Sequence, residues 1–531
     1  MLRRVVEDYL GAIHRERDYD FLFMSLLSDL GFYDIHFTHG TVEFGKDFIA
    51  KLNEDEQPVQ FAFQSKAGNV NITAWRSIVG QLNEAMLVPL SHPNFDAHLP
   101  RQIVLVSNGE LQGIAKTSFD NYQTEQKRLG HRPPIFWGKS QLADRLINSG
   151  VNSIHRATEQ GYRHLSSFFS LYSEAIRKTV TSRQIERYSQ LWFDASVPWN
   201  TRVLICASEA EIIATACERN GLLYEAITMH IAALRFLMYS LHQEEGPQDT
   251  LQDMLGQSLR RIEQACLRYV NSFEHAWRDS EEGLISLLQG FGSFATYLVH
   301  CSRFLEILGL LYFMTDDAVV STNCLSVIVE FSNGEEGAFK IIGERDTISI
   351  LLPLLALTVE GKLTDAAQRL VKATIWYCDR HEHGKGLAQF DATEDREVYT
   401  LIGHSLQRVN YSKGFTACAL SDLAAFMDEP LLYQQVVNEI KAVMVAPAYY
   451  LPQDSAEVYF VGATDLTTIP NVHYADTIST FTNYEFANHI QYEPKSFYLE
   501  PIVGCRGFMC LAVLLRDRYF PTLWPKLTRN N

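Results

Sequence analysis

The hydrophobic positions in the first 150 residues alternate between helical and strand-like spacing. Over Asp18–Leu30 the apolar residues recur at helical spacing and stop at Gly31, which predicts an amphipathic helix. A second helical pattern covers Thr73–Val88. Short apolar runs bounded by turn residues predict five strands: Tyr33–His39, Asp47–Leu52, Val59–Lys66, Gln102–Ser107 and Ile135–Trp137. With two more helices around the last strand, this order predicts an α/β sandwich.

From about residue 155 to about residue 445 the pattern is mainly α-helical. Turns such as RNG and VEGK hint at a solenoid-like stack, but no fixed repeat is present. Residues 446–531 are richer in Tyr, Thr, Pro and Asn, which predicts a small mixed subdomain or a cap, with an apolar helix in VGCRGFMCLAVLLRDRYF. We therefore divide the chain into 1–154, 155–445 and 446–531.

Composition favours a multidomain globular protein, because 47% of the 531 residues are hydrophobic and 21% are charged. No run of roughly 18 apolar residues occurs, and the N-terminus becomes charged before a signal-peptide core could form. We expect a cytoplasmic protein without a membrane partner. The nine cysteines are scattered in apolar contexts, which predicts reduced core thiols.

The acidic charge is concentrated in the C-terminal two-thirds of the chain. Residues 1–150 hold 15 basic and 18 acidic residues, so they carry only −3 of the net charge of −17. An acidic surface repels nucleic acid and suits contact with proteins. We therefore expect the helical region to sense, regulate or assemble, with a protein partner or activator, rather than to coat DNA.

The strand Val59–Lys66 carries the candidate chemistry. Alternation directs Gln64 and Lys66 to the same face, and a hairpin with the preceding strand brings Asp47 to the same end of the sheet. A carboxylate and an amide oxygen can hold Mg²⁺, and a lysine can orient or deprotonate an attacking water or offset transition-state charge. Each residue also has an ordinary explanation: a turn acid for Asp47 and solvent-facing polar side chains for the other two.

Together with the element order, DYDFLFMSLLSDLGFYDIHFTHGTVEFGKDFIAKL, VQFAFQSKAG and RQIVLVSNG resemble the PD-(D/E)XK nuclease superfamily, in its Mrr-type restriction endonuclease branch. The resemblance spans about residues 15–145 and implies a restriction-endonuclease-like sandwich. It matches Asp47 to the metal-binding aspartate and Gln64-Ser65-Lys66 to a Gln-x-Lys triplet, with Asp47 and Gln64 as metal ligands. Mg²⁺, or Mn²⁺ in its place, is the implied cofactor.

Two further acids are conditional members of this site. Glu43 falls where the branch often has another acid, although a solvated turn acid is an equal alternative. Asp20 falls at the position of a first-helix glutamate but is one methylene shorter, so helix capping, or support of the ligands without binding the metal, is an equal alternative. Lys46 stands beside Asp47 and could compete with the metal for its carboxylate.

The resemblance implies a metal-dependent DNA endonuclease that acts as a defence effector against foreign DNA. Because cutting two strands normally takes two active sites, we expect a homo-oligomer. RNA is a weaker candidate substrate, since no aromatic RNA-binding signature is present. The alternative is a catalytically degenerate nuclease fold that serves as a nucleic-acid-binding or scaffold module.

Other motifs have simpler explanations. Cys378, His381 and His383 offer three zinc-type ligands without a second pair at zinc-site spacing, which favours a polar helix end. The basic stretch Arg177–Arg187 is typical of a solvated helix face. No phosphate-binding glycine loop with its following Ser or Thr is present.

Overall fold

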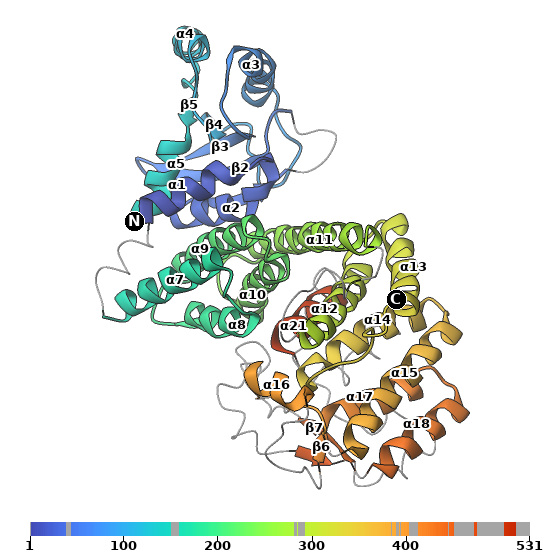
Figure 1. Ribbon diagram of the computed structural model, residues 1–531. Coiled ribbons are helices and arrows are strands. Elements are labelled where there is room, and N and C mark those ends of the chain that lie inside the picture. The colour runs from blue at the N-terminus through green and yellow to red at the C-terminus, as the bar shows by residue number, and fades with distance from the viewer. Residues whose placement is uncertain are drawn as a thin grey trace. The chain divides into compact units, whose positions relative to one another are not determined.

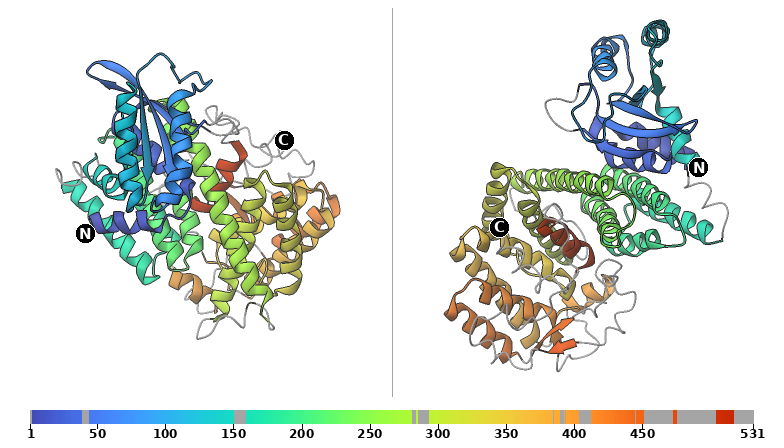
Figure 2. Two further views of the ribbon diagram at one scale, coloured as in Figure 1. Left: turned by 90° about the horizontal axis from the view of Figure 1, so that it is seen from above. Right: turned by 180° about the vertical axis from the view of Figure 1, so that it is seen from behind.

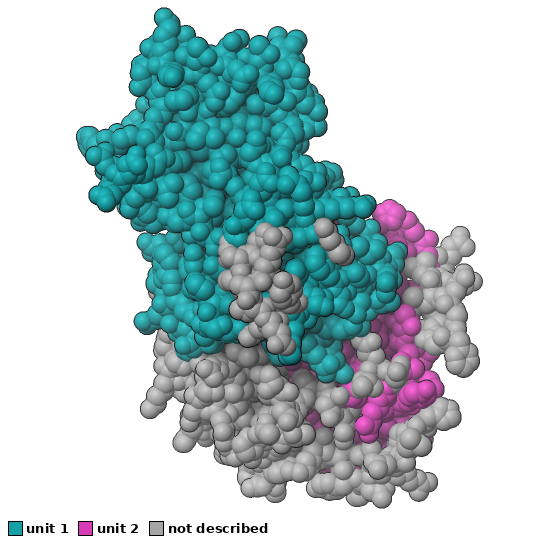
Figure 3. Space-filling view, turned by 90° about the vertical axis from the view of Figure 1, so that its left-hand side faces the viewer, with its two compact units in different colours: residues 1–261 teal, residues 262–531 magenta. Residues whose placement is uncertain are grey.

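A mixed α/β region followed by helices makes up the chain (Figure 1). The computed structural model describes residues 2–38, 44–149, 159–280, 284, 293–383, 385–388, 392, 394–402, 412–443, 445–450, 472–474 and 504–516. The chain divides into two compact units, residues 1–261 and 262–531 (Figure 3). The predicted layout of an α/β region followed by helices is confirmed, whereas the boundaries at 154 and 445 stay predictions.

The sheet of unit 1 has five strands in the order in which they occur along the chain: β1 (Tyr33–Phe37), β2 (Phe48–Glu54), β3 (Gln57–Lys66), β4 (Arg101–Ser107) and β5 (Ile135–Trp137). β1 pairs antiparallel with β2, and β2 pairs antiparallel with β3, which confirms the predicted hairpin; β3, β4 and β5 pair parallel. The parallel pairs need crossover helices. α3 (Ile72–Leu87) and α4 (Ile114–Arg128) supply them.

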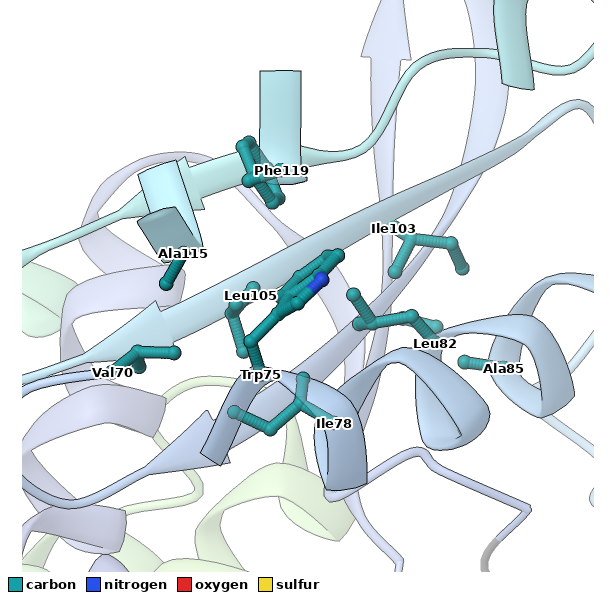
Figure 4. Packing of buried hydrophobic residues seen from close by; sticks show 10 residues of the cluster. Val70, Trp75, Ile78, Leu82, Ala85, Ile103, Leu105, Ala115 and Phe119 are labelled. Carbon is teal, nitrogen blue, oxygen red and sulfur yellow. The ribbon is translucent and has the colours of Figure 1, made fainter. Parts of the chain in front are cut away.

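Both faces of the sheet are covered, so β3 is buried along most of its length. On one face Trp75 and Leu82 of α3 and Phe119 of α4 pack on β4 (Figure 4). On the other face α2 (Asp20–Asp29) packs through Phe23, whose ring lies 5.2 Å from that of Phe48. Burial on both faces explains the continuous apolar run Ile103–Val106 of β4.

The remaining helices of unit 1 complete the α/β region and extend from one side of it (Figures 1 and 2). They are α1 (Leu2–Ala12), η1 (Glu16–Tyr19), α5 (Lys139–Asn148), α7 (Glu159–Arg177), α8 (Ser182–Ser189), η2 (Gln190–Phe193), α9 (Trp199–Arg219), α10 (Leu223–His242) and α11 (Gln248–Arg278), which runs into unit 2. α1 lies outside the predicted elements. α1 and α2 both pack on α9, so the α/β region and the first helices share one core.

Unit 2 is mainly helical. Its elements are α12 (Ser293–Met314), α13 (Ala318–Gly334), η4 (Glu344–Thr347), α14 (Ile348–Val359), α15 (Leu363–Glu382), α16 (Glu394–Leu401), α17 (Phe415–Phe426), α18 (Pro430–Ala442) and α21 (Gly504–Leu515), with the small sheet β6 (Ser412–Gly414), β7 (Val445–Tyr450) and β8 (Val472–Tyr474). α21 confirms the predicted C-terminal helix. Most of 446–531 lies outside the described residues, and a solenoid stays a prediction.

The apolar helix α12 is a core helix of unit 2. Among the described helices, it contains one segment, Phe294–Met314, that is long and apolar enough to cross a membrane. Inside the protein, 72% of its apolar window is buried, as is usual for a core helix. The eight cysteines whose side chains are described are free and buried, which confirms the prediction of core thiols.

Candidate active site

A cavity of about 160 Å³ lies at the carboxyl end of β3. It brings together four of the five predicted site residues, Asp20, Asp47, Gln64 and Lys66. Glu43 lies outside the described residues. The remaining lining residues are Glu16, Arg17, Phe37, Gly45, Ser65 and Gln81. Three carboxylates, two amides, one lysine and one arginine therefore share a small polar cavity.

The β2–β3 register brings Asp47 opposite Gln64. Phe48 pairs with Phe63, so the next antiparallel pair outward is Asp47 and Gln64. The Asp47 amide donates to the Phe63 carbonyl over 2.8 Å, which continues the ladder. The Asp47 Oδ2 atom accepts from the Ser65 amide at 2.6 Å and from Gln64 Nε2 at 2.7 Å. Pairing in the sheet therefore holds the carboxylate directly at the triplet.

Two buried glutamines on the same face of β3 differ in their hydrogen bonding. Gln60 is fully buried; its Nε2 donates to the Ala50 carbonyl and its Oε1 accepts from the Asp96 amide, each at 3.0 Å. Gln64 is only 3% exposed, and its Oε1 has no hydrogen-bond partner among the described residues. A buried oxygen left without a donor costs about 1–3 kcal/mol. Such a cost is offset when the oxygen binds a ligand.

Asp20 contributes a second oxygen of this kind. It begins α2, and Phe23 one turn later fixes the helix by packing against Phe48 and Phe63. Asp20 is 2% exposed, and its Oδ2 has no partner among the described residues. Burial raises the pKa of Asp20 to about 7; the Arg17 guanidinium opposes this shift and the Asp47 carboxylate adds to it. The alternative role for Asp20, capping of the helix, is not supported, because no side chain accepts a capping hydrogen bond at the N-terminus of α2.

Lys66 reaches the cavity at the last residue of β3. Its Nζ lies 3.1 Å from Glu16 Oε1 of η1, and its side chain is 20% exposed. The hydroxyls of Tyr19 and Ser65 are hydrogen-bonded beside this pair. The ammonium is therefore held at the cavity by an acid that is 50 residues away in the chain.

Lys46 does not compete for the Asp47 carboxylate. Its buried ammonium donates to the Phe44 carbonyl at 3.1 Å and to the Val88 carbonyl at 2.9 Å. The preceding turn is tight: Gly45 has φ +69°, and a Cβ there would lie 2.0 Å from the Gln81 carbonyl oxygen. The glycine is needed to bring this turn against α3. The expected competition is thus wrong, since Lys46 points away from the cavity.

The donor set of the cavity suits a hard divalent cation. Carboxylate and amide oxygens are the ligands that Mg²⁺ and Mn²⁺ prefer, and Mg²⁺ usually keeps several waters. Within the described ranges, no three His, Cys, Asp or Glu side chains are grouped closely enough to hold a metal by themselves. Any cation here would take the Gln64 amide oxygen and water in addition to Asp47. The Cys378, His381 and His383 segment likewise forms no such group.

Glu16 and Arg17 belong to the site but were not among the predicted residues. Both lie in the short helix η1 before α2 and line the cavity. The run HRERDYD holds both charge types at close spacing, so nothing in it singles out these two side chains. Only the packing of η1 against the end of β3 selects them.

Comparison with protein-family models, curated proteins and solved structures finds no match to this chain.

Proposed function

We propose that unit 1 carries a metal-dependent phosphodiesterase site and that the protein is a DNA endonuclease with a restriction-endonuclease-like sandwich. One observation carries the proposal: the buried oxygens of Gln64 and Asp20 that have no partner among the described residues share a cavity with Asp47 and Lys66. Most buried side-chain oxygens have a hydrogen-bond partner, so two such oxygens in one polar cavity favour a place where a ligand binds. The element order and the mixed sheet add support, since they agree with the resemblance.

Asp47 and Gln64 are the residues that would hold Mg²⁺ or Mn²⁺, with Asp20 as a further oxygen donor. The bound cation supplies positive charge that offsets the charge developing on the phosphate in the transition state. Two hydrogen bonds to Oδ2 fix the orientation of the Asp47 carboxylate. Such preorganisation removes the need to reorder ligands during the reaction.

Lys66 is the residue that acts on the reacting groups. Its ammonium can donate a hydrogen bond to a phosphoryl oxygen or to the attacking water. Glu16 orients this ammonium through the 3.1 Å ion pair. A partner acid also keeps the long lysine side chain in one rotamer, which reduces the entropy lost when substrate binds.

The wider proposal concerns the rest of the molecule. The chain outside residues 1–150 carries −14 of the net charge of −17, which supports sensing, regulation or assembly through protein contacts in a cytoplasmic defence effector. Homo-oligomerisation would supply the second active site for a double-strand break. DNA is the proposed substrate, and cleavage of RNA is measured in the same experiment.

The decisive experiment compares Lys66→Ala with Lys51→Ala in the full chain. Supercoiled plasmid and single-stranded RNA are incubated with Mg²⁺, Mn²⁺ or EDTA. Lys66→Ala should slow metal-dependent plasmid cleavage by at least about 100-fold, as loss of a transition-state donor does elsewhere. Lys51 is a matched control, because it is also a strand lysine paired with an acid and its side chain is 16% exposed.

Cleavage by Lys66→Ala at the wild-type rate would contradict this assignment. A folded wild-type protein that cleaves neither DNA nor RNA with either metal would favour the degenerate scaffold instead. Cleavage of RNA alone would keep the chemistry and change the substrate.

A further inference from the structure

Two arginines from distant parts of the chain lie over one ring at the cavity. The Arg17 Cζ is 5.3 Å and the Arg260 Cζ 5.5 Å from the centroid of the Phe37 ring. Phe37 and Arg17 line the cavity. Arg260 is also close to Asp20: burial lowers the pKa of Arg260, whereas the Asp20 carboxylate raises it. The α11 helix therefore reaches the site.

Side-chain contacts hold this part of α11 against the α/β region. Asp253 and Arg260 are seven residues apart, so they share one face of the helix. The Asp253 carboxylate lies 2.7 Å from His36 Nδ1 of β1, which is the neighbour of Phe37. The adjacent Arg261 contacts the Asp18 carboxylate of η1 at 3.4 Å. Arg260 thus extends from a helix that is anchored on both sides of it.

The Arg260 side chain keeps its donors available. Neighbouring groups desolvate the Arg260 guanidinium enough to lower its pKa, yet the residue as a whole is exposed; within the described part of the chain its guanidinium makes no hydrogen bond and no ion pair. The cavity beside it holds the carboxyl groups of Glu16, Asp20 and Asp47. These groups repel a phosphate, so an anionic substrate needs cationic side chains at the edge of the cavity. A planar guanidinium matches the oxygens of a phosphate in a two-point contact.

We infer that Arg260, with Arg17 beside it, binds a backbone phosphate of the nucleic acid at the edge of the cavity. The inference rests on the proposed function and makes the helical region a part of the substrate site. Arg17 and Arg260 are about 240 positions apart in the chain. They lie over the same Phe37 ring only when α11 is packed on β1. Any signal that shifts α11 would change substrate binding directly.

The test measures binding of a short fluorescent DNA duplex to the full chain in EDTA by anisotropy, over a series of KCl concentrations. Arg260→Ala should raise Kd about tenfold, the usual effect of removing a charge-assisted hydrogen bond. The slope of log Kd against log salt should fall by about 0.9, which corresponds to one phosphate contact. Arg260→Lys keeps the charge, so it should retain the slope while losing part of the affinity.

Arg219→Ala is the control, because Arg219 is an exposed arginine of α9 that does not line the cavity. Wild-type Kd and slope in Arg260→Ala would overturn the inference, and so would a wild-type protein without measurable duplex binding. Thermal unfolding of each variant checks that it is folded. If Arg260→Ala melts at a lower temperature than the wild type, Arg260→Gln is used in its place. Since binding is measured without metal, failure of cleavage and failure of the phosphate contact give separate results.

Discussion

Single side chains at this site differ in whether their buried polar atoms have hydrogen-bond partners. Gln60 and Gln64 are four residues apart on the same face of one strand, and both are buried. The oxygen of Gln60 accepts from the Asp96 amide, whereas that of Gln64 has no partner among the described residues. Their sequence positions are equivalent, so strand alternation alone could not have separated them. The difference comes from the loop that covers one glutamine and the cavity that adjoins the other.

Gln64→Glu should make the stability of unit 1 depend on metal. The change replaces the Nε2 donor, now 2.7 Å from Asp47 Oδ2, by a second carboxylate oxygen. Without metal, the facing acceptors should lower the free energy of unfolding by about 2 kcal/mol. Mg²⁺ should restore this loss, because a cation between two carboxylates removes their repulsion. Urea unfolding in EDTA and in Mg²⁺ measures both effects.

Gln60→Glu is the matched control for this prediction. It also introduces an acid into buried β3, but beside the Ala50 carbonyl instead of Asp47. It should destabilise the protein equally in EDTA and in Mg²⁺. Equal metal response of the two variants would contradict a cation site at Gln64.

At the scale of elements, the sequence predicts the part of the site that lies within one hairpin. Alternation along β3 and its pairing with β2 bring Asp47, Gln64 and Lys66 together. η1 and α11 contribute Glu16 and Arg260, and these residues could not be predicted. Their places depend on packing between segments far apart in the chain, which leaves no periodic signal. α1 differs, since Val5, Val6, Tyr9 and Leu10 do follow helical spacing and the signal was present.

Helix α9 carries a buried acid that should set a pH dependence of stability. Burial raises the pKa of Glu211 to about 7, against the opposing effect of Arg261, whose Nη2 lies 3.2 Å from Glu211 Oε2. The other titratable groups facing it are Tyr9, Asp18, Glu218 and His230. Between about pH 4.5 and 7 the folded state keeps a proton that the unfolded chain has released. Stability should therefore fall as the pH rises through this window.

Glu211→Gln removes this contribution. The free energy of unfolding of the wild type minus that of the variant should decrease by about 2–3 kcal/mol between about pH 5 and pH 7.5. Urea unfolding of both proteins at the two pH values measures it. Thr215→Ala, a partly exposed position on the same helix, removes no titratable group, so its difference from the wild type should not change with pH. An equal difference at both pH values would rule out a raised pKa at Glu211.

At the scale of the molecule, the sequence predicts the order of the secondary-structure elements better than the boundaries of the compact units. Five strands, their order and the change to helices after about residue 155 follow from local periodicity. The boundary at 154 rests on that change of period alone. Compactness depends on which faces are buried, and unit 1 continues to residue 261 because α1 and α2 pack on α9. A change of secondary structure therefore need not end a folding unit.

This difference predicts how fragments behave. A fragment 1–154 lacks α9 and exposes apolar side chains of α1 and α2 that now lie beside α9, such as Val6, Tyr9 and Leu22. It also loses the Asp18–Arg261 and His36–Asp253 pairs. A fragment 1–278, which keeps α11 whole, should unfold cooperatively and stay monodisperse, whereas 1–154 should aggregate or melt at lower temperature. Scanning calorimetry and size-exclusion chromatography compare the two. Equal melting temperatures and solubility would instead make residues 1–154 an independent domain, and α11 could then not be required to hold the site together.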